Sequence, residues 1–96
     1  MSNIVKKLRF TVPLTIFREG RSFVAYSPIL DLSTCGKNFE EAKKNFFEAV
    51  EIFFEELNSK GTTDEVLGEL GWEKEKNVWM PPTLIAQETE QMTVAV

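Results

Sequence analysis

The sequence predicts an α+β domain in which a three-stranded antiparallel sheet is followed by a long amphipathic helix, a short helix and a return strand. Short runs rich in β-branched and aromatic residues alternate with turn residues in the first third, and an apolar pattern of helical period follows them. The length of 96 residues supports one compact domain with a modest core. We therefore interpret residues 1–96 as a single domain.

A β-hairpin is predicted at the start of the domain. Residues 8–18, LRFTVPLTIFR, have the composition of a strand, and Pro13 limits this strand to a sheet edge or a bulge. Glu19-Gly20 provides a tight turn, after which SFVAYS over residues 22–27 alternates as the partner strand.

A third strand is predicted before the first helix. Pro28 closes the second strand, and Ile29–Asp31 form a short loop. Residues 32–35 then suit a brief strand that ends at Gly36. Cys35, the single cysteine, is expected to be a small core or strand-end residue.

The long helix is predicted to begin after Asn38, which can cap it together with Glu41 in a capping-box arrangement. It is expected to stop within Asn58–Gly61, where glycine can adopt the left-handed conformation. At 100° per residue the apolar side chains form one broad arc, which predicts a helix that covers a sheet. The members of this arc are Phe39, Ala42, Phe46, Phe47, Ala49, Val50, Phe53, Phe54 and Leu57.

A short helix and a return strand are predicted next. Thr62 with Glu65 repeats the capping pattern, and Gly71 ends the short helix. Trp72 and Val78–Met80 indicate a second hairpin or a return strand. Residues 83–96 are predicted to be a tail or an edge strand.

Charge and composition limit the functional classes. Residues 1–37 hold six basic and two acidic side chains, whereas the later segments are acidic and bring the net charge to −4. With no histidine and one cysteine, a zinc site built from these residues is excluded. No apolar run approaches the ~20 residues that span a bilayer. We expect a soluble, cytoplasmic protein that is not associated with membranes.

The centre of the sequence resembles the N-terminal domain of the HicB family of antitoxins. The resemblance lies in Phe23–Tyr26, Pro28–Leu30, Gly36 and Asn38–Ala42, followed by Phe47–Ala49. It covers about residues 8–57. It implies a small β-β-β-α-β domain similar to a reduced ribonuclease H fold, whose partner is HicA, a small basic toxin that cleaves mRNA.

The C-terminal part departs from that family. HicB antitoxins commonly end in a helix-turn-helix or ribbon-helix-helix module, whereas residues 72–96 show no pair of amphipathic helices and are acidic. This departure makes direct DNA binding doubtful. The predicted function is therefore that of an antitoxin that binds and neutralises a HicA-type toxin. The alternative is a stand-alone oligomerising interaction domain without a toxin, which would contact nucleic acid through the basic first hairpin.

Catalysis is not expected. The ribonuclease H reaction uses several carboxylates around divalent metal ions, but the first predicted strand has no acidic residue before Glu19. Glu48, Glu51 and Glu55 share one helical face, and we interpret them as solvated surface rather than as a metal cluster. We predict no catalytic residue, no metal site and no cofactor.

Two sets of surface residues are predicted to make contacts with other chains. The loop residues expected to bind a partner are Tyr26, Pro28, Leu30 and Asp31. Their alternative role is to fix the turn of the chain before the helix. The residues expected to form the interface of a homodimer or a higher homo-oligomer are Phe47, Phe54, Met92, Val94 and Val96. The alternative is that the short second helix and Trp72 or Trp79 cover the margin of the long helix within one chain.

Overall fold

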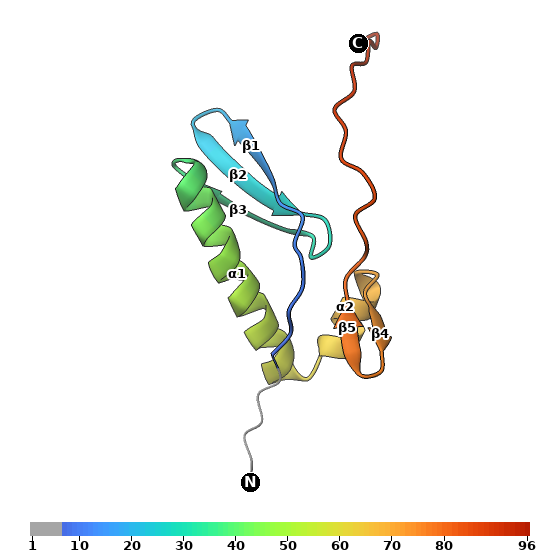
Figure 1. Cartoon of the computed structure of the whole chain (residues 1–96). Helices are drawn as coiled ribbons and strands as arrows, with labels where there is room; N and C mark the ends of the chain where they lie inside the picture. Colours follow the sequence, from blue (N-terminus) through green and yellow to red (C-terminus); the bar gives the residue numbers. More distant parts are fainter. Residues whose placement is uncertain (1–6) are drawn as a thin grey trace.

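A three-stranded antiparallel sheet with one long helix across it forms the larger part of the molecule (Figure 1). The computed structural model describes residues 7–96 and confirms the α+β class and the predicted order of elements. The strand order in the sheet is β1-β2-β3. The elements are β1 Thr15–Glu19, β2 Ser22–Ser27, β3 Leu32–Gly36, α1 Phe39–Lys60, α2 Thr63–Glu69, β4 Glu73–Glu75 and β5 Val78–Met80.

The two faces of the sheet have different surroundings. Ala25 lies opposite Ile16 and Thr34 in the neighbouring strands, and it is fully buried on the side that α1 covers. Val24 lies opposite Phe17 on the other face, where Phe17 is 53 % exposed. Because side chains alternate along a strand, α1 covers one set of side chains and leaves the other set facing outward.

β1 is shorter than the sequence predicts. The predicted strand covered residues 8–18, but pairing with β2 begins at Thr15, which lies opposite Tyr26. Because β2 ends one residue later at Ser27, the residues before Thr15 have no strand beside them to pair with. Phe10 instead packs its ring against Phe54 of α1, with 5.6 Å between ring centroids.

Local signals define both ends of α1, as predicted. The Glu41 N–H donates to Asn38 Oδ1 (2.8 Å), and the Lys37 N–H donates to Glu41 Oε1 (3.2 Å). At the other end, Gly61 adopts the left-handed conformation with φ of 67°. These contacts satisfy backbone groups that have no partner inside the helix.

β3 and α1 approach each other closely at Gly36. A Cβ at this position would collide with the backbone of Glu41 and Ala42. Thr34 Oγ1 donates to the Ala42 carbonyl (3.1 Å), and Asn45 Nδ2 donates to the Cys35 carbonyl (2.9 Å). Cys35 itself is exposed, so the strand-end position predicted for it is confirmed and a core position is wrong.

The core consists of two connected clusters. One lies between the sheet and the first half of α1, and the other lies where the second half of α1 meets α2 and the β2–β3 loop. The buried residues of the first are Ala25, Ala42 and Phe46. Those of the second are Ile29, Leu30, Leu57, Leu67 and Trp72. Phe46 and Leu67 are fully buried, so each half of the chain supplies at least one large core side chain.

α2 lacks the predicted capping box. Thr62 precedes this helix, but its side chain makes no capping hydrogen bond. Its backbone is not extended, and its N–H donates to the Leu57 carbonyl (3.0 Å) as part of the end of α1. The chain turns from α1 into α2 too tightly for Thr62 to adopt the conformation of an N-cap residue.

Strands β4 and β5 pair with each other and form a separate two-stranded sheet. Lys76 and Asn77 both have positive φ, as a two-residue hairpin turn requires. Of the two alternatives expected from the sequence, a second hairpin or a return strand, the hairpin is present, and it does not join the main sheet. Residues 83–96 form no helix or strand. Within residues 7–96, no helix has the length and apolar character needed to cross a bilayer.

Candidate functional site

The end of β2 and the loop that follows it carry the residues predicted to bind a partner. Tyr26 of β2 and Pro28 and Asp31 of the loop reach the surface, and the Tyr26 hydroxyl donates to Asp31 Oδ1 (3.1 Å). Asp31 has φ of 47°, a left-handed conformation that aspartate tolerates better than most residues. The hydrogen bond and the backbone turn together hold the polar side chains of the loop in one arrangement.

The loop is attached to the core from beneath. The Trp72 indole N–H donates to the Ile29 carbonyl over 2.7 Å in a buried contact. Leu30 is only 2 % exposed and belongs to the same cluster. The prediction that Leu30 contacts a partner is therefore wrong, because its side chain points into the core and stabilises the loop. Tyr26, Pro28 and Asp31 remain candidates for contact.

The contact with Asp31 changes the acidity of Tyr26. The hydrogen bond to Asp31 raises the pKa of the Tyr26 phenol above its usual 10.0, with smaller contributions from burial and from the negative charge of Asp31. The neutral phenol is therefore the form in which the loop presents Tyr26 near neutral pH.

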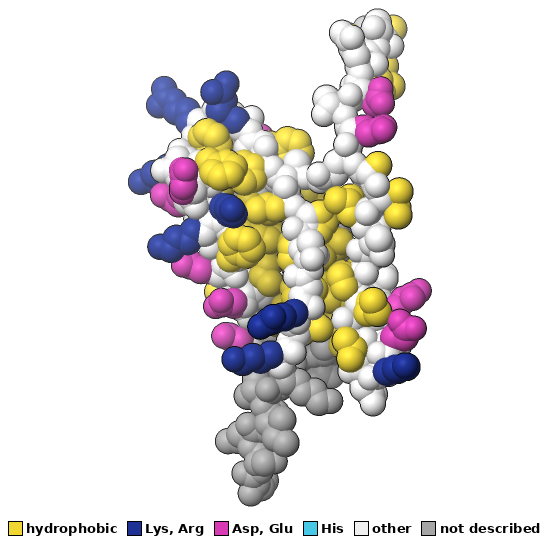
Figure 2. Space-filling view, viewed as in Figure 1, with side chains coloured by type: hydrophobic (Ala, Val, Ile, Leu, Met, Phe, Trp, Pro, Cys, Tyr) yellow, Lys and Arg dark blue, Asp and Glu magenta, His cyan; other side chains and the backbone are white. Residues whose placement is uncertain are grey.

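α1 presents more acidic than basic side chains to solvent. Figure 2 shows acidic side chains interspersed with basic ones along the outer side of this helix. The exposed members are Glu40, Glu48, Glu51, Glu55 and Glu56. In residues 7–96, the ion pair found is between Lys74 and Asp64 (3.5 Å), so none of these glutamates is paired with a basic side chain there. Residues 7–96 contain no group of three or more acidic or cysteine side chains that could hold a metal ion.

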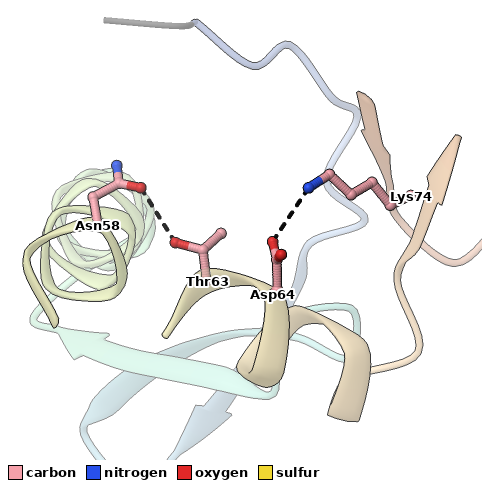
Figure 3. A network of polar contacts seen from close by, with 4 residues as sticks. All are labelled: Asn58, Thr63, Asp64 and Lys74. Atoms are coloured by element: carbon pink, nitrogen blue, oxygen red, sulfur yellow. Dashed lines mark hydrogen bonds and ion pairs between the residues drawn. The ribbon is translucent and has the colours of Figure 1, made fainter. Parts of the chain in front are cut away.

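Polar contacts join the end of α1 to α2 and the second hairpin (Figure 3). Thr63 Oγ1 donates to Asn58 Oδ1 (3.2 Å), and Asp64 pairs with Lys74 of β4. The Lys74 ammonium also lies 5.6 Å from the centre of the Trp79 ring. These contacts position the hairpin beside the C-terminal half of α1.

An apolar groove of about 770 Å³ lies between that half of α1, the segment before β1 and the second hairpin. Figure 2 shows hydrophobic side chains gathered in this region. Its lining includes Leu8, Phe10, Val50, Phe54 and Trp79. The sequence does not indicate this groove, because the strand-like composition of residues 8–18 predicts that Leu8 and Phe10 belong to the sheet. The one usable signal was Pro13, which separates Leu8 and Phe10 from the paired residues.

The two helix residues predicted for an oligomer interface differ in exposure. Phe54 is partly buried beneath Phe10 and Trp72, and its ring centroid is 6.2 Å from that of Trp72. Phe10 and Trp72 of the same chain thus cover much of Phe54. The prediction that Phe54 is open to a second chain is therefore wrong, and Trp72 covers it within one chain, as the alternative has it. Phe47 is 48 % exposed and remains available.

The tail residues predicted for the interface are all at the surface. Met92 and Val94 are 81 % and 68 % exposed, and Val96 is fully exposed. Gln87 Nε2 donates to Thr15 Oγ1 at 3.5 Å, which places the tail beside the beginning of β1. Beyond this point the tail extends away from the rest of the molecule (Figure 1).

Comparisons with known proteins give no relative for this chain. No protein-family model, curated protein or solved structure matches it. The likeness to HicB antitoxins therefore depends on the residues quoted above from the sequence alone.

Proposed function

We propose that this chain is a HicB-like antitoxin of a type II toxin-antitoxin system, which binds and neutralises a small, basic, mRNA-cleaving toxin of the HicA kind. The observation that carries the proposal is the acidic excess on the exposed side of α1, where five glutamates outnumber three lysines and none of the glutamates pairs with a basic side chain among residues 7–96. Such a surface attracts a basic protein and accelerates its association. The resemblance over residues 8–57 supplies the identity of that partner.

The β2–β3 loop supplies a second contact in this proposal. Tyr26 and Asp31 are already hydrogen-bonded to each other, and the Trp72 contact to the Ile29 carbonyl fixes the backbone between them. A loop that is ordered before binding loses less conformational entropy in the complex. Tyr26 provides an aromatic surface, of the kind that often dominates the energy of protein interfaces. The protein acts in the cytoplasm and has no catalytic role.

The test is a calorimetric titration with the toxin encoded beside this gene. We expect a stable complex, and we expect the double variant Glu48→Lys/Glu55→Lys to bind at least tenfold more weakly at low salt. The matched control is Glu73→Lys/Glu75→Lys, which makes the same change in net charge on β4 and should bind like the unaltered chain. Absence of binding by the unaltered chain, or equal weakening in both variants, contradicts the proposal.

The second candidate is a stand-alone interaction domain that contacts nucleic acid through the β1–β2 hairpin. Arg18 and Arg21 are exposed at this hairpin, and Phe17 beside them is 53 % exposed. Cationic groups next to an accessible aromatic ring suit single-stranded nucleic acid. Fluorescence anisotropy with a single-stranded RNA distinguishes this function. Binding that weakens with salt and is lost in Arg18→Ala/Arg21→Ala would favour it over the antitoxin.

A further inference from the structure

β1 has one unpaired edge. The main sheet has the order β1-β2-β3, so β1 pairs with β2 on one side only. In the part of the chain that the structure describes, no strand lies against its other side. The backbone donors and acceptors along this edge are available to another extended segment.

The flank of α1 beside that edge carries an exposed hydrophobic side chain. Asn45 donates to the carbonyl of Cys35, which lies in the opposite edge strand, so Asn45 marks the β3 side of the helix. Phe47 lies about 200° around the helix from Asn45 at ~100° per residue and so faces the β1 side. There it is 48 % exposed. Ile16 of β1 is only partly buried and packs against the cluster on this side of the sheet. The open edge thus adjoins hydrophobic surface that no described residue covers completely.

The tail has the complementary pattern. Met92, Val94 and Val96 occupy alternate positions, so in an extended chain they share one face, and Glu88 and Glu90 continue that face. All five side chains are exposed. Because the tail extends away from its own chain after Gln87, these apolar side chains have no cover there (Figure 1).

We propose that the tail of one copy adds as a strand to the open edge of β1 in a second copy, with Met92 placed over Phe47 and Ile16 and with Val94 and Val96 continuing in the direction of α1. The exchange is reciprocal, so each copy donates a tail and accepts one about a two-fold axis. This exchange would form the interface of the homodimer expected from the sequence, and the proposal does not depend on the presence of a toxin.

Charge and spacing fix the direction of the added strand. Lys43 is exposed on α1 one turn before Phe47, on the same flank of the helix. Four helical residues span ~6 Å and two strand residues span ~6.6–6.8 Å, so Glu90 reaches Lys43 when Met92 reaches Phe47. The tail then runs in the direction of α1. Since α1 and β1 run in opposite directions (Figure 1), the tail pairs antiparallel to β1.

The test is sedimentation of the chain alone at micromolar concentration. We expect twice the monomer mass of 11.0 kDa. Deletion of residues 91–96 should give a monomer, and Phe47→Glu should raise the dissociation constant at least tenfold. The control is Ile52→Glu, because Ile52 is 56 % exposed on the polar side of the same helix. It should leave the dimer intact.

A charge exchange tests the assigned contact. Lys43→Glu and Glu90→Lys should each weaken the dimer, and the double variant should restore it. Amide exchange at the β1 edge should slow as protein concentration rises. A monomer at all concentrations overturns the proposal, as does a dimer that survives deletion of residues 91–96. Either failure is independent of toxin binding, which is measured by titration with the toxin.

Discussion

The two halves of this chain use their hydrophobic residues differently. Between Thr15 and Gly61, β1–β3 and α1 enclose Phe46 completely, and both ends of the helix are capped. After Gly61, Leu67 and Trp72 enter the core, but the second hairpin and the tail expose Val78, Met80 and Ile85. The sheet and α1 thus enclose the larger core side chain, whereas the C-terminal half leaves more of its large hydrophobic side chains exposed.

The largest expected effect lies in the sheet-and-helix half. Phe46 is fully buried and Phe47, its neighbour, is 48 % exposed. Phe46→Ala should lower the free energy of unfolding by about 3–5 kcal/mol through lost packing and a residual cavity. Phe47→Ala should lower it by roughly 1 kcal/mol, in proportion to its smaller buried area. Urea unfolding at one protein concentration measures both, and equal losses would contradict this placement of α1.

Two glycines sharpen the comparison between the halves. Gly36→Ala places a Cβ against the backbone of α1, so the unfolding free energy should fall by about 1–3 kcal/mol. Gly68→Ala in α2 meets no atom within 4 Å and should raise stability by about 0.5–1 kcal/mol through helix propensity. Thermal unfolding of both variants decides. A Gly36→Ala variant as stable as the unaltered chain would show that β3 and α1 are further apart.

The two helix starts provide a smaller contrast. Asn38→Ala removes the acceptor for the Glu41 N–H and should cost about 1 kcal/mol of unfolding free energy. Thr62→Ala removes no capping bond, so its effect should stay within about 0.5 kcal/mol. Urea unfolding compares them directly. A larger loss at Thr62 would mean that its side chain caps α2 in solution.

The smallest expected effect is the pH response of the loop. Tyr26 is the single tyrosine, so phenolate absorbance reports its ionisation alone. Its pKa should lie above 10.0, and Asp31→Ala should return it towards that value. Since folding raises this pKa, the associated stability is complete below pH 10.0 and is lost as pH rises through the folded-state value. If the pKa of Tyr26 were the same in Asp31→Ala, the hydrogen bond between Tyr26 and Asp31 would not form in solution.

The features predicted correctly from sequence depend on neighbours in the chain. Asn38 with Glu41 and Gly61 set the ends of α1 through contacts within a few residues. The extent of β1 depends on where its partner strand ends, so residues 8–14 could not be assigned from their own composition. Thr62 does not cap α2 because the turn that follows α1 keeps its backbone out of the extended conformation of an N-cap residue.

Only part of the candidate site could be predicted from the sequence, because several of its contacts join residues that are far apart in the chain. Tyr26, Pro28 and Asp31 lie at the surface as expected, but the burial of Leu30 depends on Trp72, which is far away in sequence. The groove forms where three separate segments meet, and no pattern within one segment predicts their contact. The position of Phe54 depends in turn on Phe10, which packs against it from the N-terminal segment.

The most direct test of the central claim is an RNA-cleavage assay with the toxin encoded beside this gene. An equimolar amount of this chain should suppress cleavage, and Glu48→Lys/Glu55→Lys should suppress it less at the same concentration. Unchanged cleavage in the presence of excess unaltered chain would contradict the antitoxin function.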